Sequence, residues 1–196
     1  KNYNNIVLIY SNLKKIKKRN VIFSHRPEQF RNSSIFEIAK KFKIKTISIK
    51  KKNCFDNLDI VLIGGSQLIP NVKIKKNFIL NCHSGLIPQT RGLDSFKWAI
   101  YYKYPLGITL HYIDKEVDKG RIITIVETPI FKNDTLIKLA NRHYELEIET
   151  LSNFLYHIKN PKPLKCEIKD AKMRMPFDIE EEMVKRFDDY KLKFGE

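Results

Sequence analysis

The sequence predicts an α/β protein with a Rossmann-like fold, in which a mainly parallel sheet carries helices on both faces. Short apolar runs alternate along the chain with segments of helical periodicity, and this pattern is typical of strands joined by helices. The chain has 196 residues, of which 42% are hydrophobic and 30% are charged, so it is large enough to bury a core. No apolar run approaches the roughly 20 residues that a membrane-spanning helix needs.

The elements of the first half follow in order. Strands are expected at residues 5–10, which are mostly apolar, and at residues 21–23. Ser34 and Glu37 form a capping box in front of a helix whose apolar side chains recur every three or four residues. Isoleucines that alternate with polar residues predict a half-buried strand over residues 44–49.

Two nearly uninterrupted apolar runs then predict central parallel strands, at residues 58–63 and 78–80. The first run ends at Gly64-Gly65, and the second leads directly into Asn81-Cys82-His83. Ligands of open α/β sheets bind beyond the carboxyl ends of the strands. These two strand ends are therefore the candidate sites.

In the second half, Asp94 is expected to cap a helix that reaches about Tyr102, and strands follow at residues 107–113 and 121–130. A long amphipathic helix capped by Asp134 runs to about Ile158. After a proline-containing break comes a strand around residues 164–175, then a helix capped by Asp178 and Glu181. This order predicts a catalytic domain over residues 1–160 and a C-terminal extension over residues 161–196.

The net charge of +15 is compatible with nucleic acid, an anionic membrane surface or phosphorylated small molecules as partners. Lys, Asn and Ile are all abundant, so an AT-rich genome explains the charge better than nucleic-acid binding does. The three cysteines are far apart and suggest neither disulfides nor a CxxC metal site, which favours a reducing, cytoplasmic setting. No secretory signal is recognised, and residues before Lys1 stay open because the chain does not begin with Met.

Asn81 and His83 are two residues apart at the end of an apolar strand, so alternation places both side chains on the same face. An amide and an imidazole side by side can stabilise an oxyanion and move a proton. Asp118 is expected in a turn between two strands, and a carboxylate near an imidazole raises its basicity.

Each of these residues also has an ordinary structural explanation. His83 alone could be a satisfied structural histidine, Asn81 could cap a turn, and Asp118 could be only a hairpin residue. His111, in the middle of a strand, is best explained as a core histidine bonded to backbone. No HxH or HxxxH spacing supports a metal site, so no metal is predicted.

Residues 81–88, which read Asn-Cys-His-Ser-Gly-Leu-Ile-Pro and are followed by Arg91-Gly92, resemble the N-x-H-x-S/G-L-L-P…R-G signature of folate-dependent formyltransferases. Residues 107–111 and 118–120 resemble the second signature of that family, G-x-T-x-H followed by D-x-G. Residues 61–70 resemble the strand and loop that lie beside the folate pterin. The likeness covers roughly residues 20–158.

The resemblance implies that 10-formyltetrahydrofolate is the formyl donor and that Asn81, His83 and Asp118 are catalytic. Asn81 and protonated His83 would donate to a tetrahedral oxyanion, and Asp118 would pair with His83. Cys82 should point away from the site into the core. The resemblance also places the pterin against Gly65, Gln67, Leu68, Ile69, Ile113, Asp114 and Val117, and the acceptor substrate against Ser84, Gly85, Arg91 and His111.

Within this family the chain looks most like the sugar N-formyltransferases. It shares with them Arg91-Gly92 before a helix that holds Trp98, although an anchor in the core is the simpler role for that tryptophan. The glycine-rich phosphate loop of glycinamide-ribotide enzymes is replaced at residues 11–13 by Ser-Asn-Leu. After Pro161 the chain is too short for the second domain of the methionyl-tRNA enzymes.

The predicted acceptor is therefore a nucleotide-linked amino sugar of the kind used for surface polysaccharides, and neither a membrane nor nucleic acid is expected as a partner. A homodimer is compatible with this prediction, but the sequence does not decide the oligomeric state. Formylation of glycinamide ribotide in purine synthesis is one alternative. A second is a non-catalytic module on the same fold that binds an anionic ligand or nucleic acid.

Overall fold

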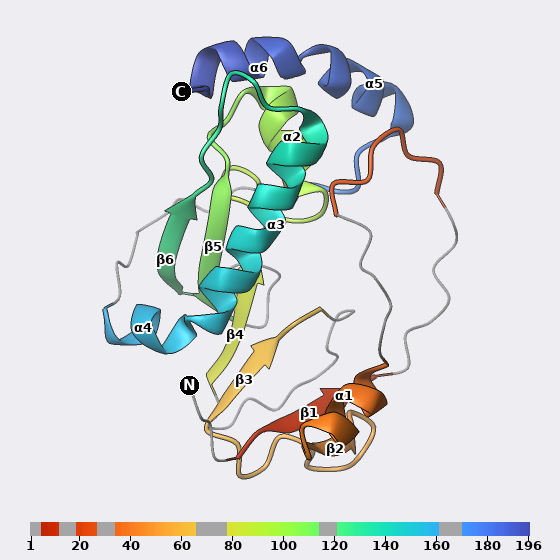
Figure 1. The fold of residues 1–196 in the computed structure, drawn as a ribbon, viewed down its shortest axis with the longest axis vertical. Helices are drawn as coiled ribbons and strands as arrows, with labels where there is room; N and C mark the ends of the chain where they lie inside the picture. The colour runs from red at the N-terminus through yellow and green to blue at the C-terminus, as the bar shows by residue number, and fades with distance from the viewer. Residues whose placement is uncertain (1–4, 12–18, 27–33, 66–77, 114–120, 161–169) are drawn as a thin grey trace.

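The computed structural model describes residues 5–11, 19–26, 34–65, 78–113, 121–160 and 170–196. Its centre is a four-stranded sheet in the order β3–β4–β5–β6 (Figure 1). The strands β3 and β4 are parallel, whereas β4 with β5 and β5 with β6 are antiparallel. Together with the helices, this sheet confirms the predicted α/β class. The strand bounds are β3 Ile60–Ile63, β4 Phe78–His83, β5 Gly107–Tyr112 and β6 Ile122–Glu127.

A second, smaller sheet pairs β1 (Val7–Tyr10) with β2 (Lys45–Ser48) in parallel, and α1 (Ile35–Lys41) precedes β2. The predicted capping box is confirmed: the Glu37 backbone N–H donates to Ser34 Oγ at 3.2 Å, and the Ser34 backbone N–H donates to the Glu37 carboxylate. Figure 1 shows this unit at the opposite end of the molecule from the C-terminal helices.

The helix α3 (Leu136–Ser152) packs against β4 and β5, and the short α4 (Phe154–Lys159) packs against β6. Between them lies an apolar core of Leu80, Cys82, Ile108, Leu110, Ile123 and Phe154. Because Leu80 and Cys82 point into this core, the alternate residues of β4, Asn81 and His83, point to the other face. The predicted core position of Cys82 is confirmed.

The helix α2 (Ser95–Tyr102) is covered by α5 (Phe177–Lys185) and α6 (Phe187–Phe194), at the end of the molecule that Figure 1 shows uppermost. Trp98 Nε1 donates to the Met173 carbonyl at 2.8 Å, which fits an anchoring role for the tryptophan. Another core of wholly buried side chains joins α2 to the C-terminal tail, residues 170–196: Phe96, Ala99, Ile100, Met175, Met183 and Tyr190.

Close backbone contact fixes the start of the tail. Gly92 pairs with Lys172 as an isolated bridge, and the Lys172 N–H donates to the Arg91 carbonyl at 2.7 Å. Gly92 has a φ of 100°, and a Cβ there would lie 2.3 Å from the Lys172 carbonyl oxygen. Both the conformation and the space therefore require glycine at this position. The boundary at residue 160 between domain and extension stays a prediction.

Three capping predictions are wrong in detail. The N-cap of α3 is Thr135, one residue later than expected, because the Asp134 carboxylate accepts from the Phe131 N–H and from Arg142 instead. The helix α5 begins after Pro176, so Asp178 and Glu181 lie inside it rather than at its cap. Asp94 does precede α2, but its carboxylate makes no capping bond and binds arginines.

The described residues of two predicted strands do not form strands. Residues 21–23 have no strand partner among the described residues, because the Phe23 N–H donates at 2.8 Å to the Glu180 side chain. Of the strand expected around residues 164–175, the described residues 170–175 contribute a bridge at Lys172 alone. The long helix expected from 134 to 158 breaks at Asn153, which separates α3 from α4. Of the helices that the structure describes, none is both long and apolar enough to cross a membrane.

Candidate active site

The register between β4 and β5 gathers four polar side chains near the carboxyl end of β4. Asn81 pairs with His111, and His83 pairs with Thr109. Because side chains of paired residues lie on the same face of a sheet, all four share the face opposite to the apolar core. Thr109 and His111 are almost completely buried, so this is a shielded, polar patch.

His111 holds the amide of Asn81. Its Nδ1 lies 2.9 Å from the Tyr112 carbonyl oxygen, which can only accept, so Nδ1 carries the proton. The Nε2 of the neutral ring then accepts from Asn81 Nδ2 at 3.3 Å. This bond engages one N–H of the amide, and the second is the donor that Asn81 can offer to a substrate oxygen. His111 is thus a buried histidine bonded to backbone, as expected, and it also orients the amide of Asn81.

His83 is turned toward the loop that follows β4. Its Nε2 lies 2.9 Å from the Thr90 carbonyl oxygen and 3.2 Å from Ser95 Oγ. The carbonyl can only accept, so Nε2 carries a proton and the imidazole is presented as a hydrogen-bond donor. The structure thus places Asn81 and His83 on one face, but it anchors them differently: Asn81 to β5, and His83 to the loop before α2.

That loop is fastened to β5 by side-chain hydrogen bonds. Thr109 Oγ1 donates to the Gly85 carbonyl at 2.7 Å and accepts from the Ile87 N–H at 3.2 Å. A Cβ on Gly85 would lie 2.6 Å from both Thr90 Oγ1 and Ser95 Cβ. Glycine is needed here because the loop packs on itself, and this packing sets the position of the two groups that hold His83.

Ser84 begins a second hydrogen-bonded chain, which leads to His143 in α3 and on to Thr128, the residue after β6. Ser84 Oγ lies 2.9 Å from His143 Nε2, and His143 Nδ1 lies 2.7 Å from Thr128 Oγ1. Burial lowers the pKa of His143 to about 3, while a hydrogen bond with the Ser84 backbone opposes this shift. A neutral ring with so low a pKa is a poor general base, so the chain orients Ser84 rather than making it a nucleophile.

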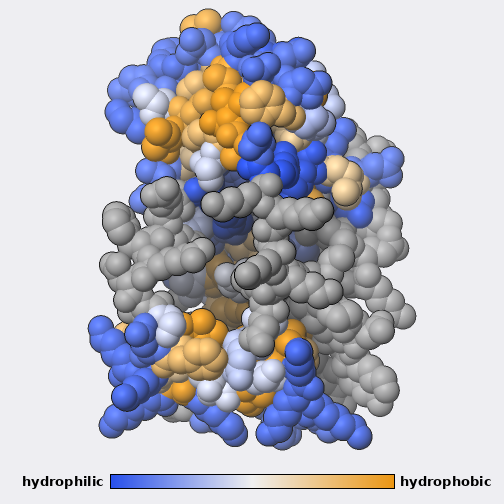
Figure 2. Space-filling view, turned by 90° about the vertical axis from the view of Figure 1, so that its right-hand side faces the viewer, coloured by the Kyte–Doolittle hydropathy of each residue, from blue (hydrophilic) through white to orange (hydrophobic). Residues whose placement is uncertain are grey.

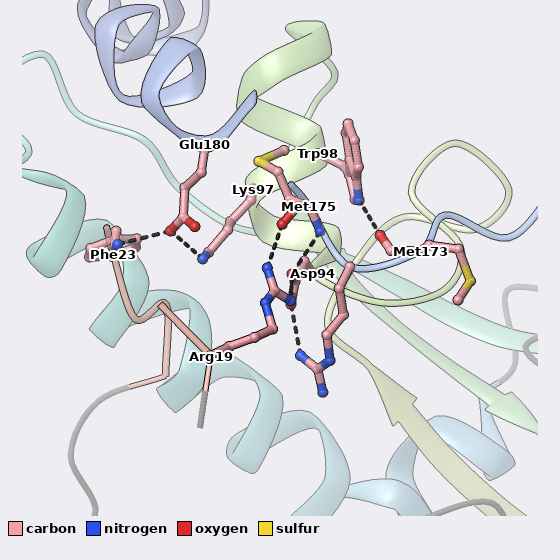
Figure 3. A network of polar contacts seen from close by, with 9 residues as sticks. Arg19, Phe23, Asp94, Lys97, Trp98, Met173, Met175 and Glu180 are labelled. Atoms are coloured by element: carbon pink, nitrogen blue, oxygen red, sulfur yellow. Dashed lines mark hydrogen bonds and ion pairs between the residues drawn. The ribbon is translucent and has the colours of Figure 1, made fainter. Parts of the chain in front are cut away.

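A cavity of about 230 Å³ is lined by polar and charged side chains and one apolar residue: Arg19, Ser24, His25, Asp94, Lys97, Arg174 and Val21. Asp94 is followed directly by Ser95, whose hydroxyl contacts His83, so the cavity adjoins the loop between β4 and α2. Figure 3 shows how residues from distant parts of the chain converge here.

Sequence reasoning missed this cavity. Asp94 is paired with Arg19 and with Arg174, which lie 75 and 80 residues away along the chain. No local spacing could have linked them. The structure marks Asp94 as unusual by a φ of 51°, in the left-handed region that non-glycine residues rarely adopt, but the sequence carries no signal of this conformation.

The remaining predicted site residues divide into two groups. Gly65 follows β3 and has a φ of 123°. Ile113 continues β5, and its N–H donates to the Ile79 carbonyl at 2.8 Å. Arg91 is buried in the loop between β4 and α2. The others lie outside the described residues: Gln67, Leu68, Ile69, Asp114, Val117 and the catalytic candidate Asp118. The roles assigned to all of these residues stay predictions.

Two other chemistries receive no support from the described residues. Burial raises the pKa of the Cys82 thiol well above its ordinary value, so a thiolate nucleophile is disfavoured. Within the described ranges, no group of three or more His, Cys, Asp or Glu side chains could hold a metal ion.

With this geometry in place, the comparison with known families is decisive. The family described as "Formyl transferase" matches residues 2–155. The chain belongs to the formyl transferase family. The predicted family resemblance is therefore confirmed, and it extends over the sheet, the loop between β4 and α2, and α3.

Curated members of the formyl transferase family match at modest identity. A methionyl-tRNA formyltransferase from Fusobacterium nucleatum is 25% identical over 167 residues, which cover 84% of this chain and 49% of that protein. A phosphoribosylglycinamide formyltransferase from Haemophilus influenzae is 31% identical over 96 residues, covering 47% of this chain and 45% of that protein. The chain thus spans about half the length of the curated relatives it matches.

Solved structures show the same fold. The formyltransferase PseJ from Anoxybacillus kamchatkensis is 19% identical with a TM-score of 0.55, and the match covers 92% of this chain and 96% of that one. A sugar N-formyltransferase from a Shewanella species is 21% identical with a TM-score of 0.56, covering 76% of this chain and 70% of that one.

Proposed function

We propose that this protein transfers a formyl group from 10-formyltetrahydrofolate to the primary amine of a nucleotide-linked amino sugar. The observation that carries the proposal is the pair of hydrogen-bond donors, Asn81 and His83, on one face of β4 in a member of the formyl transferase family. A shielded site with oriented N–H donors suits a reaction that passes through an oxyanion.

In the proposed reaction the neutral amine of the acceptor attacks the formyl carbon, and a new C–N bond forms. The carbonyl electrons move to oxygen, where the second N–H of Asn81 and the positive charge of protonated His83 would stabilise the negative charge. Collapse of this adduct breaks the bond between the formyl carbon and N10 of the folate. The amine loses a proton and N10 gains one, so the products are a formamide and tetrahydrofolate.

The proton transfer is assigned to Asp118 and His83. Asp118 would pair with the imidazole and favour its charged form, and a water molecule between them would relay the amine proton to N10. This assignment rests on the family signature at residues 118–120, which lie outside the described residues.

The donor would bind beside the ends of β3 and β5. At Gly65 a Cβ would meet no described atom within 4 Å, so the backbone there is open to a flat ligand. Ile113 continues β5 on the opposite side of β4. The pterin would lie between these two positions and bond mainly to backbone, with the formyl group directed toward Asn81.

The amino-sugar acceptor is supported by the extent of the fold shared with PseJ, which includes the tail as well as the sheet. The PseJ structure is described as a complex with UDP-4,6-dideoxy-4-formamido-L-AltNAc and tetrahydrofolate. Since 19% identity establishes the fold alone, the acceptor of this chain remains our proposal.

The test is a competition assay that follows release of tetrahydrofolate. Nucleotide-linked 3-amino and 4-amino hexoses, glycinamide ribotide and methionyl-tRNA are offered to the protein with the formyl donor. We expect turnover with one of the amino sugars, and a faster rate at mildly alkaline pH because the acceptor amine must be neutral. Turnover of glycinamide ribotide in the absence of any sugar turnover would assign the protein to purine synthesis instead.

A further inference from the structure

The cavity beside the loop between β4 and α2 has the chemistry of an anion site. Three cationic side chains line it, Arg19, Lys97 and Arg174, against the single lining carboxylate of Asp94. Lys97 is compensated by Glu180, with which it forms an ion pair between side chains that are 2% and 0% exposed. Even with Glu180 included, the cations remain in excess.

The two arginines keep much of their donor capacity. Arg19 bonds Asp94 at 3.4 Å and the Met175 carbonyl, while Arg174 bonds Asp94 at 3.1 Å through Nη1. A guanidinium has five N–H donors, so these bonds leave several on each side chain. Their side chains are 37% and 52% exposed, so a ligand can reach them from solvent.

Asp94 acts as the organiser of this pair. Its carboxylate, which is 4% exposed, binds both guanidinium groups and also accepts from the Met175 N–H at 3.0 Å. It therefore holds two cations of the cavity lining side by side, and Figure 3 shows Arg19 and Asp94 in this network. The Asp94 carboxylate also repels any anion bound by these arginines, because its negative charge lies close to them.

His25 contributes to the cavity as a neutral group. It stacks on Phe96 with ring centroids 6.0 Å apart, and burial lowers its pKa to about 4. Asp94 opposes this shift, whereas Lys97, Arg26 and Arg174 add to it. At neutral pH the imidazole can thus donate a hydrogen bond without adding charge.

The position of the cavity relates it to catalysis. Asp94 lines the cavity, and the next residue, Ser95, contacts His83. A molecule whose anionic group enters the cavity would extend along this loop toward His83 and Asn81. Figure 2 views the right-hand side of Figure 1 and shows strongly hydrophilic residues directly below the apolar surface near the top of the molecule.

We infer that this cavity binds the phosphate or diphosphate group of the acceptor, with Arg19 and Arg174 as its principal ligands and His25 as an additional donor. Planar guanidinium groups match phosphate oxygens in pairs, which a single lysine cannot do. The identity of the acceptor rests on the proposed function, but the binding of a phosphate group by these residues does not.

Two sources of negative charge could occupy the site, namely the phosphates of a nucleotide-linked acceptor and the glutamate carboxylates of the folate. The phosphate is favoured because the cavity already contains a carboxylate, Asp94, in contact with the same guanidinium groups. The experiment therefore compares the two kinds of anion directly.

The experiment is calorimetric titration of the full chain, at constant ionic strength, with inorganic pyrophosphate, uridine diphosphate and a folate triglutamate. We expect Arg174→Gln to weaken pyrophosphate and uridine diphosphate by about ten- to hundredfold, the loss expected for charge-assisted hydrogen bonds. Triglutamate binding should change less than twofold. Arg186→Gln is the matched control, because Arg186 bonds Tyr101 and Glu182 at a distance from the cavity.

The substitution Asp94→Asn distinguishes an effect on anion binding from an effect on folding. Asparagine tolerates the left-handed conformation of residue 94 and can still accept from the Met175 N–H, but it removes the like charge. Pyrophosphate should therefore bind several-fold more tightly, which a damaged fold cannot produce. Three results would each overturn the inference. In the first, Arg174→Gln and Arg186→Gln weaken pyrophosphate binding equally. In the second, Arg174→Gln abolishes triglutamate binding alone, and in the third the unmodified protein does not bind pyrophosphate. If the phosphate results hold while no acceptor is formylated, the proposed function fails and the anion site stands.

Discussion

Two polar networks flank His83, and they are built in opposite ways. The network on the sheet side consists of neutral groups: Asn81 bonded to His111, and Ser84 bonded through His143 to Thr128. The network on the tail side consists of ions that join segments far apart in sequence: Arg19 and Arg174 with Asp94, and Lys97 with Glu180.

The difference shows what each network is suited to do. Neutral hydrogen bonds in a buried site fix the direction of a donor without a permanent charge, so the donor responds to charge that develops on a substrate. Buried ion pairs respond little to a reaction, but the loss of either partner leaves an isolated charge. We therefore expect substitutions on the sheet side to reduce catalysis and those of the buried Lys97–Glu180 pair on the tail side to reduce stability.

The largest expected effect tests the ionic side. Glu180→Leu leaves the ammonium of Lys97 without its partner at a position that is 2% exposed, and the Phe23 N–H without its acceptor. The free energy of unfolding should fall by about 3–5 kcal/mol, as for other broken buried pairs. Chemical denaturation monitored by circular dichroism measures this loss.

The control is the double variant Lys97→Met/Glu180→Leu, in which both charges are absent and the volume is kept. It should recover most of the lost stability, because two apolar side chains replace a buried ion pair at little cost. A double variant as unstable as the single one would show that the pair itself is not the source of the loss.

The next largest effect tests the neutral side. Asn81→Ala removes the amide that His111 orients, and kcat should fall by about 10²–10³, equivalent to roughly 2.7–4 kcal/mol for one lost oxyanion donor. His83→Ala and Asp118→Ala should also lower kcat by orders of magnitude, while donor affinity changes less. Steady-state kinetics with the accepted amino sugar would measure these losses. Folded variants with near-normal turnover would refute the assigned roles.

Acid pH is expected to act on two histidines, the buried His143 and the half-buried His25. The pKa of His143 is lowered by burial to about 3 and that of His25 to about 4, whereas both have the ordinary value of 6.5 in the unfolded chain. The unfolded state then binds more protons between about pH 4 and 6.5. Stability should be complete above pH 6.5 and fall by about 1.4 kcal/mol per pH unit for each histidine as the pH drops.

Urea denaturation at pH 7, 6 and 5 measures this slope. His143→Gln should be less stable than the unmodified protein at pH 7 but should lose less stability between pH 7 and 5, because one of the two histidines no longer titrates. A slope that is unchanged in this variant would mean that His143 is not the group protonated on unfolding.

The comparison also explains what the sequence could and could not predict. Asn81 and His83 are separated by one residue on a strand, so alternation was enough to place them on the same face. The capping box at Ser34 and Glu37 was visible for the same reason, since both partners lie within one helical turn. The register that sets Asn81 opposite His111 required pairing across 30 residues, which no local pattern encodes.

The contacts of the tail-side network could not be predicted from local sequence patterns. The prediction that Asp94 would cap α2 had the right position, but the carboxylate found two arginines and the Met175 N–H instead of its own helix. The expected strand at residues 21–23 failed because the Phe23 N–H bonds a glutamate 157 residues away. Where tertiary partners compete for a polar group, short-range rules identify the residue but not its bond.

The smallest expected effect concerns the chain from Ser84 through His143 to Thr128. A neutral imidazole has one N–H and one lone pair, so one of the two hydroxyls donates to the ring and the other accepts from it. Thr128→Val keeps the shape of the side chain but removes its hydroxyl, and the free energy of unfolding should fall by about 1 kcal/mol.

Thr128 and Ser84 are linked through the ring of His143, so the two substitutions should not be independent. In a double-mutant cycle, Ser84→Ala and Thr128→Val should show a coupling of about 0.5 kcal/mol or more, because loss of one hydroxyl changes which nitrogen of His143 carries the proton. Nitrogen chemical shifts of the imidazole would report this change of tautomer directly. Ser152→Ala, which removes an exposed hydroxyl bonded to the Glu149 carbonyl, is the control and should be additive with either change. Strict additivity of Ser84→Ala with Thr128→Val, together with an unchanged tautomer, would show that His143 fills space without transmitting orientation to the loop between β4 and α2.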